Sequence, residues 1–168
     1  MTSTSTSTYT RTQTATHISD VLMATMRDIL TRLGIDASRL LRDWDQDQKA
    51  IAAWIVEGSL KQVVLECHHP SGEVGPVLEF PVAYTSANVG DSVFVTSQTR
   101  VVNYMEKVRH LAPAGSTYKI LCEFNFTPSA QDGWSTAVRA SLDDLRGRTI
   151  GTVASAPHAS TSARIHTR

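Results

Sequence analysis

The sequence predicts an α+β fold in which three helices pack on a small, mostly antiparallel sheet. Three stretches repeat apolar residues at the three- and four-residue spacing of helices with one buried face. Three others are short apolar runs bounded by turn residues, as in strands. Helices and strands do not alternate regularly, which argues against a doubly wound sheet. The helical stretches are 17–33, 36–58 and 96–113, and the strand-like ones are 60–69, 76–84 and 116–126.

The composition is that of one globular domain. The chain has 168 residues, of which 41% are hydrophobic and 19% charged, and this length suffices for a single core. Sixteen basic residues balance sixteen acidic ones, so no excess positive charge indicates nucleic acid or an anionic membrane. No apolar run reaches the length of a membrane span. With two cysteines and no apolar leader, we expect a cytoplasmic protein.

The N-terminal region is a Ser/Thr repeat. Residues 2–8 alternate Thr and Ser, a low-complexity composition that predicts a flexible segment over 1–8. The following stretch, Tyr9–Thr16, is rich in β-prone residues and is a candidate edge strand.

Two helices are expected next. Thr16 is a candidate N-cap for the first, which Gly34 ends. Asp36 is placed to cap the second, which reaches Gly58, with a possible interruption at "DQDQ" (45–48). Both tryptophans of this second stretch are interpreted as core anchors.

The first two strands are predicted to form a hairpin, and the third follows later in the chain. "PSGEVG" is a turn between 60–69 and 76–84. Pro81 cannot donate a ladder hydrogen bond, so we expect it at a sheet edge or a bulge. Residues 116–126 form the strongest strand, with alternating apolar and polar positions. Beyond it, "RTIGTVA" (148–154) is a further short β-like run, and Trp134 lies in the turn-like stretch "QDGWSTAV".

Catalytic motifs are weak. The sequence has neither a Walker loop nor GxGxxG. The densest group of potential ligands is Cys67-His68-His69, with Cys122 on another strand. Because neighbouring strand residues point to opposite faces, these side chains do not readily converge on one zinc ion. We expect no metal and no cofactor, and the paired carboxylates Asp143 and Asp144 are interpreted as solvated.

Three stretches in order resemble bacterial HORMA-domain proteins. They are "YTRTQTATHISDVLMATMRDILTRLGID", "AIAAWIVEGSLKQVVLECHHPSGEV", and "YKILCEFNF" followed by "GWS". The resemblance is specifically to the family found beside cGAS-like nucleotidyltransferases (CD-NTases) in the anti-phage systems called CBASS. It implies a HORMA-like α+β fold with a flexible segment at 1–8, a core at 9–126 and a mobile C-terminal seatbelt at 127–168.

In that family the seatbelt wraps over a closure-motif peptide, which adds a strand to the sheet. The resemblance implies a non-catalytic signalling protein that activates the nucleotidyltransferase when closed and is reset by a AAA+ remodelling ATPase. The implied peptide-binding residues are Tyr118, Lys119, Ile120, Leu121, Glu123, Asn125 and Trp134. The implied seatbelt docking edge is Val77, Glu79 and Val82, and the implied remodeller handle is Thr8, Tyr9, Thr10 and Arg11.

Two other functions stay open on the sequence. One is a small hydrolase or metal-dependent enzyme using Cys67-His68-His69. The other is an α+β scaffold or adaptor without a conformational switch. For the tail "ASTSARIHTR", a seatbelt strand and a closure motif for another copy are equally compatible with the residues, so self-association through the tail stands beside a monomer.

Overall fold

The computed structural model describes residues 3–85 and 94–168, and side chains for 10–85 and 94–168. The helices and strands follow the chain in this order: α1 (Ser3–Leu33), α2 (Ser38–Arg42), α3 (Trp44–Glu57), β1 (Leu60–His68), β2 (Val74–Tyr84), β3 (Val95–Thr96), α4 (Thr99–Val108), the short 3-10 helix η1 (Arg109–Leu111), β4 (Thr117–Phe124), β5 (Arg146–Ser155) and β6 (Ala159–Thr167). The predicted α+β fold is confirmed, with the helices packed on an antiparallel sheet.

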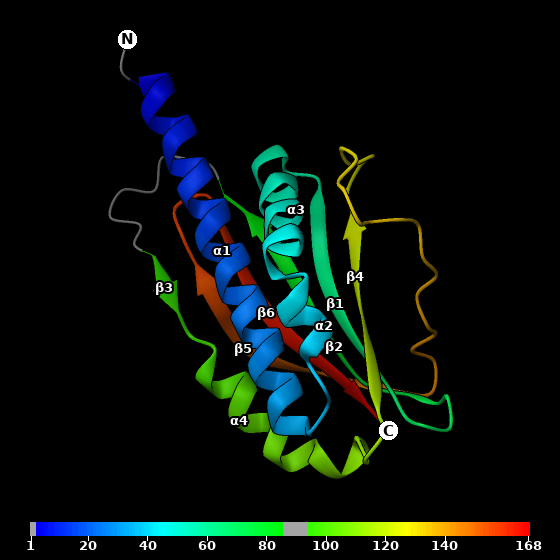
Figure 1. Cartoon of the computed structure of the whole chain (residues 1–168). Coiled ribbons are helices and arrows are strands. Elements are labelled where there is room, and N and C mark those ends of the chain that lie inside the picture. The colour runs from blue at the N-terminus through cyan, green and yellow to red at the C-terminus, as the bar shows by residue number, and fades with distance from the viewer. Residues whose placement is uncertain (1–2, 86–93) are drawn as a thin grey trace.

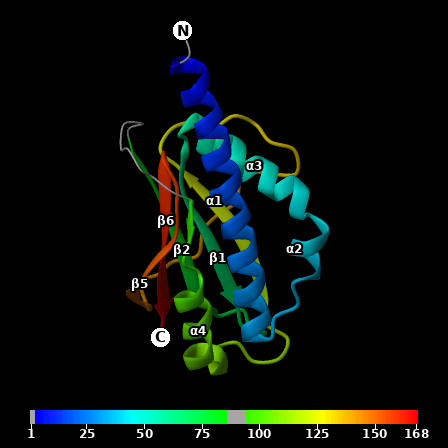
Figure 2. The ribbon, with the colours of Figure 1, turned by 90° about the vertical axis from the view of Figure 1, so that its left-hand side faces the viewer.

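The sheet has six strands in the order β3-β5-β6-β2-β1-β4. The helices cover one of its faces, with α1 running along the sheet and α3 beside it (Figures 1 and 2). Alternation along β1 sends Val63, Leu65 and Cys67 into the core beneath these helices, where each is fully buried. The opposite face, which we call the back face, carries Gln62 and Glu66 from the same strand.

Helix α1 is longer than the sequence indicated. It begins at Ser3 and so includes most of the Ser/Thr repeat, for which the composition predicted no ordered structure. The expected edge strand at Tyr9–Thr16 is wrong, because this stretch is helical. Thr16 is not an N-cap either: it lies inside α1, and its hydroxyl donates to the Thr12 carbonyl oxygen at 3.0 Å. At Thr14 and Ala15, which are each 1% exposed, burial outweighs the weak helix propensity of Thr.

The second predicted helix is divided. It consists of α2 and α3, which meet at Asp43, just before the "DQDQ" stretch. The Asp36 carboxylate accepts from the Ser38 backbone N–H at 2.9 Å at the start of α2. Gly58 ends α3 in a left-handed conformation with φ of 77°, as expected for a C-terminal glycine.

Pro81 does not lie at an edge or a bulge, so that expectation is wrong. Strand β2 is interior, between β1 and β6. Its pairing with β6 runs from Glu79–Arg164 to Val82–Thr161 without a shift in register, and only Phe80 and Pro81 lack paired partners. A proline is tolerated here because the ladder omits these two positions and resumes in register.

The C-terminal residues form the β5–β6 hairpin, which extends the sheet beyond β2. The tail "ASTSARIHTR" is part of β6, in the middle of the sheet between β5 and β2. In this structure the tail is thus a strand of its own chain, as the seatbelt-strand alternative expects. No helix in the described part of the chain is long and apolar enough to cross a membrane.

Candidate functional site

Strand β4 has an open edge. Within the described ranges it pairs only with β1, so its other side has no strand beside it. Residues 127–145, which we call the crossing segment, leave the end of β4, pass along this edge and then turn behind the sheet toward β5 (Figure 1). The segment therefore encloses the β4 edge without hydrogen bonding to it as a strand.

A slot lies between the β4 edge and the crossing segment. It consists of two adjoining cavities of about 470 and 320 Å³. Both are lined by Ile120, Leu121 and Trp134, together with Ser135 and Ala137. Strands pair at a spacing of about 4.8 Å, so the open edge is the place where an extended chain would add to this sheet.

One end of the slot is aromatic and the other charged. Trp54 stands edge-on to Phe124 and to Trp134, with ring centroids 4.9 and 5.2 Å apart. Trp134 is thus partly buried against the core, although its indole Nε1 has no hydrogen-bond partner among the residues that the structure describes. In the smaller cavity Asp47 lies near Asp43, and burial followed by repulsion from Asp43 raises the pKa of Asp47.

The first half of the crossing segment is fastened to α3. The Trp54 indole donates to the Ser129 carbonyl oxygen at 2.8 Å, and the Ser129 backbone N–H donates to the Glu57 carboxylate at 3.0 Å. Further along, the Gln46 amide donates to the Asp132 carbonyl oxygen at 2.6 Å. Gly133 follows with φ of 81°, and a Cβ there would lie 1.5 Å from Gln46 Nε2. The left-handed backbone favours glycine at this position, while the Gln46 amide is the end of an exposed side chain that could shift.

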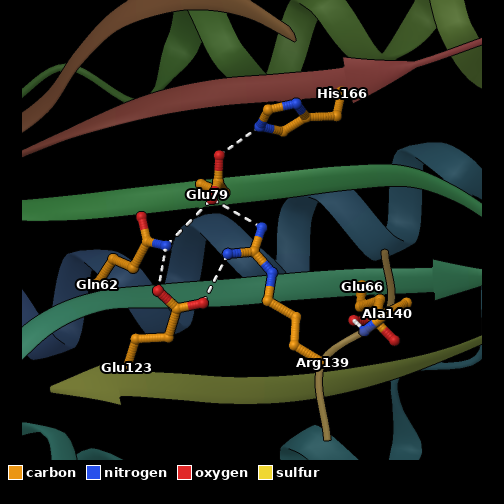
Figure 3. A network of polar contacts seen from close by, with 7 residues as sticks. All are labelled: Gln62, Glu66, Glu79, Glu123, Arg139, Ala140 and His166. Atoms are coloured by element: carbon orange, nitrogen blue, oxygen red, sulfur yellow. Dashed lines mark hydrogen bonds and ion pairs between the residues drawn. The ribbon is translucent and has the colours of Figure 1, made fainter. Parts of the chain in front are cut away.

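The second half is fastened to the back face by Arg139 (Figure 3). Its guanidinium donates to Glu123 of β4 at 2.6 Å and to Glu79 of β2 at 2.7 Å. These strands lie on either side of β1, so one side chain spans the width of three strands. We call Arg139, Glu79 and Glu123 the Arg139 clasp. The Gln62 amide of β1 donates to the same two carboxylates, at 3.0 and 2.8 Å.

Two further polar contacts support the clasp. The Ala140 backbone N–H donates to the Glu66 carboxylate at 3.1 Å, and Glu66 is 1% exposed. On β6, the His166 ring contacts the Glu79 carboxylate. Beside these contacts, Leu142 and Leu145 pack on a small apolar cluster of Val64, Val77 and Leu121 on the back face.

The clasp has a definite charge state. Burial acts to raise the pKa of Glu79, but the hydrogen bonds from His166 and Arg139 outweigh it and hold that pKa below its usual value. Burial likewise acts to lower the pKa of Arg139, and its bonds to Glu123 and Glu79 raise it overall. The clasp is therefore a charged pair of hydrogen bonds, the stronger kind in proteins.

The residues named from the sequence occupy different parts of this region. Tyr118, Lys119, Ile120, Leu121 and Trp134 line the slot. Glu123 and Asn125 do not: Glu123 holds Arg139 on the back face, and the Asn125 backbone N–H donates to Ser59 at 2.8 Å. Val77, Glu79 and Val82 lie opposite His166, Arg164 and Thr161 of β6. Thr8, Tyr9, Thr10 and Arg11 lie near the start of α1.

The Cys/His group is dispersed. Cys67 is fully buried in the core, and burial followed by the charge of Glu66 raises its pKa to about 12, which disfavours a thiolate. His68 points to the other face and bonds Glu66 at 2.7 Å, while His69 Nδ1 accepts from the Ser71 backbone N–H. Cys122 borders the slot instead. These side chains do not form one centre.

Arg139, Gln46 and Glu66 are functional candidates that the sequence did not reveal. Each takes part in holding the crossing segment. Gln46 and Arg139 lie in polar stretches without a motif, whereas Glu66 lies within the apolar strand β1. The signal for Glu66 and Glu79 was available: both are carboxylates inside strands that are otherwise apolar, and a buried carboxylate needs a partner. Nothing in the sequence identifies that partner as Arg139.

The family model for bacterial HORMA domain 2 matches residues 1–168, and none of the curated proteins matches the sequence. Solved structures share the fold at low identity. A chain of the mitotic checkpoint complex has a TM-score of 0.68 at 11% identity, with 92% of this chain and 98% of that chain covered. C. elegans HTP-1 bound to the HIM-3 closure motif has a TM-score of 0.66 at 12% identity, with 89% of this chain and 88% of that chain covered.

A bacterial structure also matches. It is the E. coli MS115-1 HORMA:CdnC:Trip13 complex, with a TM-score of 0.58 at 13% identity, covering 94% of this chain and 89% of that chain. The match of the family model over the full length, together with the enclosed edge of β4, leads to one conclusion: this chain belongs to the bacterial HORMA domain 2 family.

Proposed function

We propose that this protein is a non-catalytic signalling module that binds a closure-motif peptide as an added strand on the edge of β4. The observation that carries the proposal is the enclosed open edge: β4 pairs only with β1 among the described strands, and the crossing segment passes over its other side. Backbone hydrogen bonds to the edge would give affinity, and side-chain pockets in the slot would give selectivity. HTP-1, a protein of this fold, was solved with a closure motif.

The proposal includes a conformational switch. A peptide reaches β4 only when the crossing segment moves aside or when a free peptide end threads beneath it. Once the segment is in place, the peptide is held by a covalent loop as well as by contacts. Binding thus shifts the protein toward the closed arrangement by the difference in affinity between its two states.

The proposed partners are a cGAS-like nucleotidyltransferase, which the closed protein binds and activates in anti-phage defence, and a AAA+ remodelling ATPase that reopens it. The supporting observation is the similarity to the HORMA protein of the E. coli complex with CdnC and Trip13. The ATPase would engage the start of α1 at Thr8–Arg11, where the helix extends beyond the rest of the body (Figure 1). The cytoplasm is the proposed location.

Size-exclusion chromatography with the proposed partner, a cGAS-like nucleotidyltransferase, tests the activator role. The eluted complex is assayed for synthesis of a cyclic oligonucleotide. A stable complex with stimulated synthesis is the expected result. Failure to form a complex, with peptides selected for binding to this protein also present, would contradict the activator role and leave peptide binding to be judged by itself.

Peptide binding has its own test. A displayed library of random peptides is selected on the protein, and the tail is then probed by limited proteolysis. Binding peptides are expected to protect the crossing segment from cleavage. A scaffold without a switch would be cut equally with and without peptide, which is the outcome that favours the non-switching alternative.

A further inference from the structure

The crossing segment is held on the back face by a contact that touches no residue of the slot. Arg139 is one of the few points where the segment meets the sheet through charged groups, and its guanidinium nitrogens donate at 2.6 and 2.7 Å. Its side chain is 22% exposed, and those of Glu79 and Glu123 are 12% and 31% exposed. These are partly desolvated pairs, in which charge-assisted hydrogen bonds contribute more than at a fully exposed surface.

The position of the clasp decides what it controls. Trp134 and Ala137 line the slot, and Arg139 follows two residues later on the far side of the sheet (Figure 3). Because Arg139 reaches both β4 and β2, the segment cannot lift from the β4 edge unless both ion pairs break. The fastenings at Ser129 and Asp132 hold the other end of the same loop to α3.

Among the described residues, Arg139 is the one cation that pairs with both Glu79 and Glu123. Glu79 and Glu123 share the Gln62 amide, which is neutral, and Glu79 also contacts His166. Removing the guanidinium leaves two carboxylates on either side of β1 without their shared cation. Opening the clasp is therefore costly, and the closed arrangement is correspondingly long-lived.

We propose that the Arg139 clasp sets the rate at which the crossing segment opens over the β4 edge, and therefore the rates of peptide capture and release. This inference rests on the proposed peptide-binding function but not on contact with the peptide. Arg139, Glu79 and Glu123 do not line the slot, and the clasp lies behind any added strand. Its loss accelerates capture and release together, so the dissociation constant changes much less than either rate. Arg139 is in this sense a positioning residue.

Cys122 provides a measurement of opening that needs no peptide. It borders the slot beneath the crossing segment, whereas Cys67 is fully buried in the core. A maleimide carrying a polyethylene glycol chain is too bulky for the slot, so it reacts with Cys122 only when the segment lifts. Reaction at Cys67 needs unfolding of the core. Mass spectrometry of digests separates the two labelling rates within one sample.

The Arg139→Ala variant is expected to label at Cys122 roughly tenfold faster than the unchanged protein, as befits the loss of a charge-assisted hydrogen bond, while Cys67 labels at an unchanged rate. Arg139→Lys keeps the charge but not the fork that reaches two carboxylates. Its Cys122 labelling rate is expected to lie between those of the unchanged protein and Arg139→Ala. The matched control is Val138→Ala, at the neighbouring position, where the side chain is 87% exposed. It leaves both rates unchanged.

A structural effect on the whole fold is distinguished by a second variant. Arg139→Ala combined with Glu79→Gln and Glu123→Gln removes the unpaired carboxylates and restores melting temperature, but Cys122 labelling stays fast. Equal acceleration at Cys67 and Cys122, or an unchanged Cys122 rate in Arg139→Ala, overturns the proposal. If no selected peptide binds while Cys122 labelling behaves as expected, the proposed peptide binding is contradicted. The control of segment opening by Arg139 is then still supported.

Discussion

The β5–β6 hairpin and the crossing segment that leads to it are attached to the same sheet in different ways. The hairpin continues the antiparallel ladder through β6 on β2, and its Ile165 and Ala163 are buried in the main core. The crossing segment contributes no strand, and it is held by side-chain contacts at Ser129, Asp132, Trp134, Arg139 and Ala140. Few contacts mean a lower local free energy of opening, so we expect the crossing segment to open more readily than the hairpin.

The largest expected effect is in the hairpin. Ile165→Ala removes a side chain that is 1% exposed in the main core, and we expect it to lower the free energy of unfolding by about 2–5 kcal/mol. Chemical denaturation measures it. Leu142→Ala, in the crossing segment, packs only on the small back-face cluster and should cost clearly less. Equal losses for the two variants would remove the distinction between the two regions.

Trp134→Ala comes next. It deletes the ring that packs on Trp54 and borders both cavities of the slot. We expect weaker binding of selected peptides with a smaller loss of thermal stability, because Trp134 anchors the segment from outside the main core. The measurement is melting temperature with and without peptide. Equal losses of melting temperature with and without peptide would show that Trp134 contributes to stability alone.

The difference between the large core and the C-terminal hairpin also explains which strands could be predicted from the sequence. The strands 60–69 and 76–84 and the strong strand 116–126 were predictable because their apolar patterns serve one large core. Strand β6 was not, since "ASTSARIHT" consists mostly of small and polar residues, and its inward-facing residues are buried by packing in the main core against α1. Residues such as Ala163, without bulk of their own, carry no hydrophobic signal of a strand.

Helix α1 is a second element that local composition did not predict correctly. A Ser/Thr repeat reads as flexible because its own side chains bury little apolar area, yet it continues a helix whose later turns are firmly packed, with Ile18 and Leu22 fully buried. In the site, the resemblance placed Trp134 and the β4 edge together, but the clasp was not predictable. Ion pairs between residues sixty positions apart, such as Glu79 and Arg139, depend on the path of a segment that has no periodic pattern.

A smaller effect is expected at Gly133. Gly133→Ala should loosen the crossing segment by about 1–3 kcal/mol, because a Cβ meets Gln46 and φ is 81°. Cys122 labelling measures the change. The control is Gly72→Ala in the β1–β2 turn, where φ is 93° and no atom lies within 4 Å. It strains the backbone away from the crossing segment and should leave Cys122 labelling unchanged. If Gly72→Ala accelerates labelling as much as Gly133→Ala, the effect is not local to the crossing segment.

Acid should loosen the segment by less than the Gly133 change. The pKa of Glu79 lies below its ordinary value of 4.5, so its contribution to closure is complete above about pH 4.5 and is lost as the pH falls through the lowered value. The groups that contact Glu79 are His166 of β6, Gln62 of β1 and Arg139, and Arg164 of β6 lies opposite Glu79 in the ladder. Amide hydrogen exchange over 134–141, corrected for its intrinsic pH dependence and referenced to β1, follows the loosening. Glu79→Gln cannot ionise and should flatten this profile; the same profile in both proteins would assign the acid response to other carboxylates.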